Sequence, residues 1–206
     1  QKNSFGLNSC FLNTDDPINL FDKWMEEAKK TEPNDPNAVS LATSSKESIP
    51  SVRMVLLKDF NENGFVFYTN LNSQKGKDLK ENPYAAMCFH WKSLLRQIRI
   101  VGKISLVTDE VADKYYSSRS YASRIGAWAS NQSEKLDTRD QLMKSIENFK
   151  KKFNDEKKVL RPKYWSGWNL SPDSIEFWLD GDNRIHERLK YSKNKIGNWT
   201  KSLLSP

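Results

Sequence analysis

The sequence predicts a mainly antiparallel β fold with peripheral helices, an α+β arrangement closed as a barrel or a sandwich. Several short runs rich in valine, isoleucine, phenylalanine and tyrosine are separated by turn signals. The links between successive runs are too short for the crossover that parallel strands require. A helical block over residues 108–153 interrupts these runs, and further strand-like runs follow it.

The first element is a helix within residues 15–30. Asp16 can cap it, and Pro17 suits the first helical turn. An apolar stripe at helical spacing predicts the face that packs on the core, and it consists of Leu20, Phe21, Trp24, Met25 and Ala28.

The remaining elements follow from apolar alternation, caps and breakers. Asn61 to Gly64 form a turn that pairs the strands on either side of it. Strands are expected over residues 38–45, 51–60, 64–70, 84–91, 96–107, 168–181 and 184–195, and helices over 73–82, 108–119, 120–130 and 136–153.

The bulk composition restricts the function classes. The 206 residues include 33 basic and 26 acidic side chains, a formal charge of +7 that suits a nucleic acid, an acidic membrane or a phosphorylated small molecule. No run approaches the roughly 18 apolar residues of a membrane span. Two cysteines and two histidines lack zinc-site spacing, and no signal peptide is visible. A cytoplasmic enzyme or binding protein is expected, and the first residue, Gln1, suggests that the chain starts further upstream.

Several cationic and amide side chains are candidates for binding an anionic ligand. Arg53 and Lys58 flank an apolar strand, and Lys75 stands at a helix start, where anions are favoured. Gln97 shares a strand face with Arg99, opposite two isoleucines. Ordinary surface lysines and a half-exposed strand explain each segment equally well, or better, when it is taken alone.

The helical block adds a second group. Tyr115, Arg119 and Ser123 are spaced by four, so a continuous helix would place them on one face as a phosphate grip. A solvent-facing helix is an equally good explanation. Gln132 and Ser133 follow in a loop.

The stretch IEFWLDGDNRIHER is the hardest to explain structurally. If it continues as a strand, Arg184, His186 and Arg188 point to one side, close in sequence to Trp178. Together with the other candidates, these residues favour a phosphorylated aromatic ligand, and two such ligands explain the number of anion-binding groups.

Five motifs resemble the pyridoxamine/pyridoxine 5′-phosphate oxidase family: RMVLLK, FVFYTN, RQIRIVG, IGAWAS followed by QS, and IEFWLDGDNRIHER. The resemblance runs in order from about Asp15 to the C-terminus. It implies an FMN-binding split β-barrel and a homodimer with FMN at the subunit interface. It also implies oxidation of pyridoxine or pyridoxamine 5′-phosphate to pyridoxal 5′-phosphate, with O2 reduced to H2O2, and no nucleic-acid or membrane partner.

The resemblance implies one domain over residues 1–206, with an arm over 1–14 and a dimerisation region over 160–206. It assigns the FMN phosphate to Arg53 and Lys75, helped by Ser133. The flavin is contacted by Gln97 and Gln132, and across the dimer by Trp178 and Arg188. Its remaining lining consists of Met54, Val55, Leu56, Lys58, Tyr68 and Thr69.

The family pattern assigns the substrate phosphate to Lys58, Tyr115, Arg119 and Ser123, and places Arg184 and His186 over the substrate ring as the catalytic pair. Two alternatives keep the fold: a relative that acts on another substrate, and a non-catalytic carrier of vitamin B6 phosphate. A third, a basic nucleic-acid binder, predicts a colourless protein.

Three positions depart from the family pattern. Gln74 stands where the family has an arginine beside the FMN phosphate, Ser166 replaces a glycine, and Leu203 replaces an arginine near the C-terminus. Since none of them is a substrate-contact position, activity remains the expectation.

Overall fold

The longest strand, β7 (Trp165–Leu179), organises the sheet. Along one edge it pairs with β6 (Arg96–Leu106) over nearly its whole length. Its other edge is shared, because its first part pairs with β4 (Gly64–Asn70) and its last part with β8 (Glu187–Lys193). One strand thereby connects the barrel-forming part of the sheet to the C-terminal strands.

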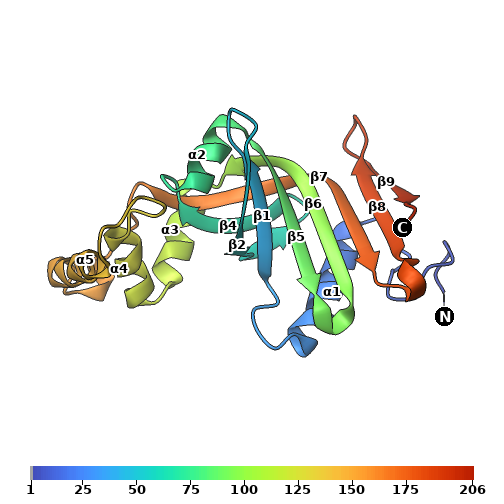
Figure 1. Cartoon of the computed structure of the whole chain (residues 1–206), viewed down its shortest axis with the longest axis horizontal. Helices are drawn as coiled ribbons and strands as arrows, with labels where there is room; N and C mark the ends of the chain where they lie inside the picture. Colours follow the sequence, from blue (N-terminus) through green and yellow to red (C-terminus); the bar gives the residue numbers. More distant parts are fainter. Residues whose placement is uncertain (1) are drawn as a thin grey trace.

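The computed structural model describes residues 2–206, so Gln1, the first residue of the expected arm, lies outside the described residues. All strand pairs in the described part are antiparallel, in one nine-stranded sheet with the main order β2-β1-β5-β6-β7-β4-β3. The sheet curls into an open half-barrel (Figure 1), which confirms the predicted fold class. The other strands are β1 (Ala38–Ser44), β2 (Pro50–Leu56), β3 (Asp59–Asn61), β5 (Tyr84–Trp91) and β9 (Trp199–Leu203).

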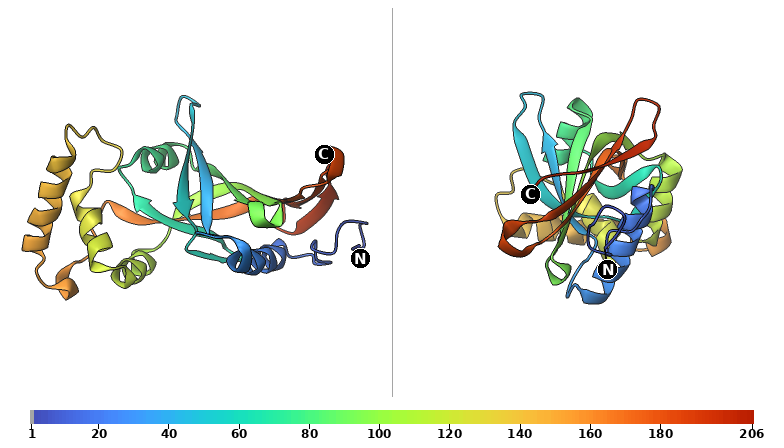
Figure 2. Two further views of the ribbon diagram at one scale, coloured as in Figure 1. Left: turned by 60° about the horizontal axis from the view of Figure 1, so that its bottom comes forward. Right: turned by 90° about the vertical axis from the view of Figure 1, so that its right-hand side faces the viewer.

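The helices lie in two places, on the surface of the barrel and beyond one end of the sheet. α1 (Pro17–Thr31) packs on the barrel, whereas α3 (Asp109–Ser118), α4 (Tyr121–Ala129) and α5 (Arg139–Lys152) project beyond one end of the sheet, far from β8 and β9 (Figures 1 and 2). The remaining helices are α2 (Gln74–Glu81) and the short 3₁₀ turns Lys92–Leu94, Glu156–Lys158 and Asp182–Arg184. Within residues 2–206, no helix combines the length and the apolar character needed to cross a bilayer.

Aromatic packing under α1 holds the barrel core together. Asp16 caps the helix by accepting a hydrogen bond from the Ile18 N–H, as predicted. The predicted apolar stripe is buried, and the Phe21 ring makes edge contacts with Phe60, Phe65 and Phe89 at centroid distances of 4.8–5.3 Å. These contacts bring strands from both halves of the sheet onto one helix.

The expected strand over residues 51–60 is wrong, because the chain changes partner in its middle. β2 pairs with β1 at one end of the sheet order, and β3 pairs with β4 at the other. Leu57 and Lys58 connect the two edges: the Leu57 N–H donates to Asn37 O, and the Lys58 N–H donates to Val66 O. The curl of the sheet brings these edges together, which no local pattern in the sequence encodes.

Replacing Phe21 with alanine is expected to lower the free energy of unfolding by about 3–5 kcal/mol, because the fully buried ring leaves a cavity among three other rings. Urea unfolding followed by tryptophan fluorescence measures this loss. Phe5→Ala is the control, since Phe5 is 40% exposed and its loss is expected to cost under about 1 kcal/mol. Equal losses in the two variants would contradict the assignment of Phe21 to the core.

Candidate functional site

A cavity of about 710 Å³ lies where the barrel meets the helical block. Its wall combines barrel strands, the start of α2, and helices α3 and α4. It brings together most of the sequence-predicted site residues, namely Met54, Val55, Leu56, Lys58, Tyr68, Thr69, Lys75, Tyr115, Arg119, Ser123 and Gln132. The cavity also contains six residues that the sequence reasoning missed: Asn70, Ser120, Gly126, Ala127, Ser130 and Trp165.

Lys75 is a buried cation in this cavity, with an exposed fraction of 8%. Its Nζ donates to Thr69 Oγ1 at 3.2 Å, to Gln132 Oε1 at 3.1 Å and to Ser73 Oγ at 3.4 Å. All three acceptors are neutral, and no ion pair of Lys75 is found among residues 2–206. Burial and then the nearby Arg53 charge lower the pKa of Lys75. A buried ammonium without a carboxylate partner marks an anion-binding position.

Arg53 lies beside this position without lining the cavity. Its Nη1 donates to Thr43 Oγ1 at 2.6 Å and to Leu41 O at 3.2 Å, and its Nη2 donates to Ser51 Oγ at 2.7 Å. The guanidinium therefore reaches across β1 towards α2. We call Arg53 and Lys75 together the phosphate cradle, because the family resemblance assigns the FMN phosphate to these two residues.

Arg119 supplies a second cation at another part of the cavity. Its Nη1 is buried and has no hydrogen-bond partner within the described chain. Its guanidinium carbon lies 4.7 Å from the Trp165 ring centroid, and burial lowers the pKa of Arg119. An orphaned guanidinium N–H that lines a cavity is suited to a ligand anion.

The condition for a single helix face is not met, because Tyr115 lies in α3 and Ser123 lies in α4, two separate helices as the expected ranges 108–119 and 120–130 have them. Arg119 ends α3 with an extended backbone, φ −73° and ψ 152°, and Ser120 caps α4 by accepting from the Ser123 N–H. The break turns α4, and all three predicted residues still reach the cavity. Ser120 had a readable signal, because a serine before an apolar helical run is a frequent N-cap.

Stacked rings form the apolar wall of the cavity. Tyr68 and Tyr115 are stacked at 3.9 Å between centroids, and Trp165 continues the stack 5.4 Å from Tyr68. Burial, followed by the Tyr115 and Asp59 charges, raises the pKa of Tyr68. Gly167 pairs with Tyr68 across the sheet, and a Cβ at Gly167 would lie 2.7 Å from Tyr68 Cε1. The missing side chain at this position is what lets the Tyr68 ring lie flat on β7.

A second group of predicted residues lies at the other end of the sheet. Gln97 pairs with Trp178, and Trp178 pairs with Arg188. The Trp178 ring lies 4.7 Å from the His186 ring. We call Gln97, Trp178, Arg184, His186 and Arg188 the C-terminal group; none of them lines the cavity.

The single strand face expected for Arg184, His186 and Arg188 is wrong. Arg184 belongs to a 3₁₀ turn and has a φ of +65°, His186 lies in the link, and only Arg188 is in β8. Among residues 2–206, His186 has no partner in a neighbouring strand and instead contacts the turn that precedes it. The Gly181 N–H donates to His186 Nδ1 at 3.2 Å, and Asp180 Oδ1 lies 3.0 Å from the same nitrogen.

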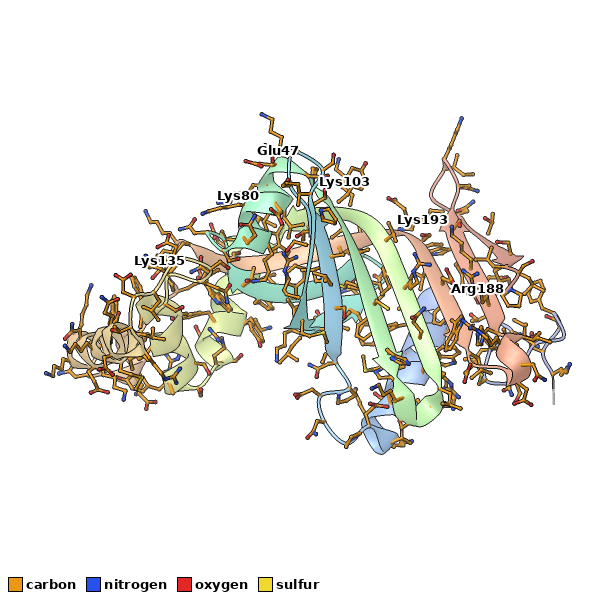
Figure 3. The ribbon with its side chains drawn as sticks, in the orientation of Figure 1. Glu47, Lys80, Lys103, Lys135, Arg188 and Lys193 are labelled. Carbon is orange, nitrogen blue, oxygen red and sulfur yellow. The ribbon has the colours of Figure 1, made fainter. Side chains whose placement is uncertain are left out.

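The cavity residue Trp165 and Trp178 of the C-terminal group lie towards opposite ends of β7. Trp165 lines the cavity at the start of β7 and Trp178 lies near its end, so roughly 40 Å of strand separates them at about 3.3 Å per residue. Arg188 and the helical block accordingly lie at opposite ends of the molecule (Figure 3). Ser133, which follows Gln132 with a φ of +71°, does not line the cavity. Among residues 2–206, no cluster of three or more metal-ligating side chains is found.

Comparison with known sequences identifies strong relatives. Residues 25–153 match the family model described as pyridoxamine 5′-phosphate oxidase, and residues 165–206 match the pyridoxine 5′-phosphate oxidase C-terminal dimerisation region. The chain is 68% identical over 206 residues to the pyridoxine/pyridoxamine 5′-phosphate oxidase of Pelagibacter ubique, with 100% of this chain and 99% of that protein covered. It is 50% identical to the same enzyme of a Chelativorans species, with 95% and 93% covered.

Solved structures share the fold. PhzG from Burkholderia lata, solved in complex with tetrahydrophenazine-1-carboxylic acid, superposes with a TM-score of 0.89 at 26% identity and covers 97% of both chains. A pyridoxamine 5′-phosphate oxidase-related FMN-binding protein from Nostoc punctiforme superposes with a TM-score of 0.75 at 16% identity, covering 94% of this chain and 100% of the other.

Gly167→Ala is expected to disturb the ring stack, because the new methyl group collides with Tyr68 and the wide ring cannot retreat past Tyr115. A loss of about 1–3 kcal/mol in unfolding free energy follows from overpacking, together with a weaker near-UV circular dichroism signal. Gly126→Ala is the matched control, since a Cβ there meets nothing within 4 Å. An unchanged near-UV spectrum in Gly167→Ala would show that Gly167 does not position Tyr68.

Proposed function

Because the chain belongs to the pyridoxamine 5′-phosphate oxidase family, we propose that it oxidises pyridoxine 5′-phosphate or pyridoxamine 5′-phosphate to pyridoxal 5′-phosphate in vitamin B6 metabolism. It is an oxidoreductase, and the finer proposal concerns its cofactor and residues. FMN, when bound, supplies hydride acceptance at its N5 atom and is reoxidised by O2 to give H2O2.

The observation that carries this proposal is the pair of uncompensated cations in one cavity. Lys75 and Arg119 are partly or fully buried, line the same space, and lack carboxylate partners among the described residues. FMN and the substrate are both phosphorylated ring systems, so each requires one anion-binding position. The volume of about 710 Å³ falls in the range of small-molecule sites.

The residues present fit FMN. Lys75 and Arg53 would hold its phosphate, with Ser133 at the loop beside Gln132. The segment from Met54 to Lys58, at the end of β2 and in the link after it, would line the flavin together with Tyr68 and Thr69, and Gln132 would meet its polar edge. The cation that the family pattern has at Gln74 is missing, and the Gln74 amide instead donates to Asp78 Oδ1 at 2.8 Å.

The substrate phosphate would occupy the Arg119 position, with Lys58, Tyr115 and Ser123 around it. Binding a phosphate remote from the reacting carbon supplies energy that orients the pyridine ring. The stacked wall of Tyr68 and Tyr115 and the flavin together restrict how that ring can lie, and this converts a chance encounter into an oriented pair.

The C-terminal group would complete the site from a second subunit. None of its members lines the cavity of its own chain, and four of its five members lie in the matched dimerisation region. In a two-fold dimer both subunits use the same surface, so each contact between them occurs twice. Val52 and Met54 on edge strand β2 are 68% and 60% exposed, which is consistent with an apolar surface that a second copy covers.

In the completed site, Arg184 and His186 would lie over the substrate ring. The reacting carbon loses a hydride, and its hydroxyl or amino group loses a proton. The alcohol thereby becomes the aldehyde, and the amine becomes an imine that water converts to the aldehyde and ammonia. Arg184 would stabilise charge that develops near this carbon. His186, held by Gly181 and Asp180, would orient the polar groups of the ring.

Two alternatives share the fold. One is an oxidase whose substrate bears a carboxylate in place of a phosphate, like the ligand in the PhzG structure. A B6-phosphate carrier would bind the same ligand without turnover. A phosphate is favoured over a ring carboxylate, because Lys58, Tyr115 and Ser123 line the same cavity as Arg119 and a phosphate has more acceptor oxygens for these donors than a carboxylate has.

Purified protein with FMN is expected to be yellow and to release one H2O2 for each pyridoxal 5′-phosphate formed from pyridoxine 5′-phosphate. Arg119→Met is expected to raise KM by about 10- to 100-fold, the value of one charged hydrogen bond, with a smaller change in kcat. Arg139→Met on the exposed start of α5 is the control. Binding without peroxide indicates a carrier, and an unchanged KM removes Arg119 from the substrate site.

Mixed dimers test the shared site. Lys75→Met removes one of the two cations proposed to bind the FMN phosphate and is expected to lose FMN. Arg184→Ala is expected to retain FMN but lose turnover. Co-expression gives dimers of which half are mixed, and each mixed dimer has one intact site, so about a quarter of wild-type activity is expected. Activity that stays at the level of the separate variants would show that each site uses one chain only.

A further inference from the structure

Asp78 is a buried acidic side chain in a region whose other charged groups, Arg53 and Lys75, are cations. It lies on α2 with an exposed fraction of 2%. Its carboxylate accepts from Thr43 Oγ1 at 2.7 Å and from the Gln74 amide at 2.8 Å. A buried carboxylate is costly unless it is paired, and here its cationic partner is Arg53, with Nη2 at 3.8 Å from Oδ2.

Thr43 links the two charges. Its hydroxyl accepts from Arg53 Nη1 at 2.6 Å and donates to Asp78 Oδ2, so the guanidinium is connected to the carboxylate through one buried oxygen. Thr43 is itself 4% exposed, which keeps the network out of bulk water. Arg53 is thereby held over β1, facing α2.

The same carboxylate changes the charge of the phosphate cradle. Burial and then the like charge of Arg53 lower the pKa of the neighbouring Lys75, because two cations close together repel each other. With Asp78, two cations and one carboxylate leave one net positive charge to meet a phosphate dianion.

We propose that Asp78 is the resident counter-charge of the phosphate cradle: it stabilises Arg53 while the cradle is empty, and its negative charge limits how tightly a phosphorylated cofactor binds. This inference rests on the proposed function, because it takes FMN as the ligand of the cradle. Asp78 acts through Arg53 and the local charge, so it is a positioning residue.

The neutral variant Asp78→Asn separates charge from shape. The amide has nearly the same size and can still accept from Thr43 or Gln74 through its oxygen. The empty protein is expected to melt a few degrees lower, about the shift for losing one buried ion pair in a chain of this size, since Arg53 loses its counter-ion. FMN is expected to bind about tenfold more tightly, because one negative charge has been removed from the network that holds Arg53.

The experiment titrates FMN and riboflavin into flavin-free wild type and Asp78→Asn and follows flavin fluorescence; the melting temperature of each flavin-free protein is recorded. Riboflavin has the same ring and no phosphate, so its Kd is expected to be unchanged. A purely structural role would change both ligands alike. Asp78→Ser, a smaller neutral side chain, gives the same comparison if Asp78→Asn does not fold.

Glu27→Gln is the matched control, because Glu27 forms a carboxylate–guanidinium pair with Arg96 outside the cavity. It is expected to lower the melting temperature and to leave both Kd values unchanged. An FMN Kd that is unchanged or weaker in Asp78→Asn, or one that changes in parallel with riboflavin, overturns the inference while the proposed function stands. Wild type that does not bind FMN overturns both.

Discussion

The pairing of β6 with β7 is the constraint on which the rest of the structure depends. Its register shifts between Val101 and Gly102, where Gly102 pairs with Pro172 and Asp173 is left over as a bulge. A Cβ at Gly102 would lie 2.0 Å from Ser171 O, so only glycine permits this close approach. A bulge bends a strand and increases its twist. Here it separates the part of β7 that pairs with β4 from the part that pairs with β8.

The bend divides β7 into two parts, and each part holds a different group of candidate site residues. The first part of β7 contributes Trp165 to the cavity wall, and Gly167 lies under the Tyr68 ring, whereas the last part contributes Trp178 to the C-terminal group. Within one chain, none of the C-terminal group lines the cavity. A second copy of the chain is the proposed source of this group at each cavity, and edge strand β2 exposes the apolar side chains of Val52 and Met54.

In the empty cavity two cations, Lys75 and Arg119, lack charged partners among the described residues, which is electrostatically unfavourable. Lys75 is surrounded by neutral oxygens and Arg119 has an orphaned donor, so both cations are free to form charged hydrogen bonds with an anion without first breaking an ion pair. Asp78 moderates this arrangement at Arg53. The balance between stability without ligand and affinity for ligand therefore lies in a few charges around α2, whereas the barrel core, packed around Phe21, is independent of them.

The sequence by itself determined the features that depend on neighbouring residues. The cap and buried stripe of α1, the hairpin at Asn61 to Gly64 and the alternation of Gln97 and Arg99 with buried isoleucines all follow from local propensity and periodicity, and the structure confirms them. The family motifs also indicated most residues of the cavity. Only the tertiary structure decided what depends on contacts between distant segments. The strand break at Leu57 and Lys58 exists because the curled sheet brings its two edges together, and the turn at Arg184 exists because the chain folds back onto Gly181. Trp165 was missed because its partners Tyr68 and Arg119 are distant in sequence, and side-chain packing across such distances leaves no periodic signal.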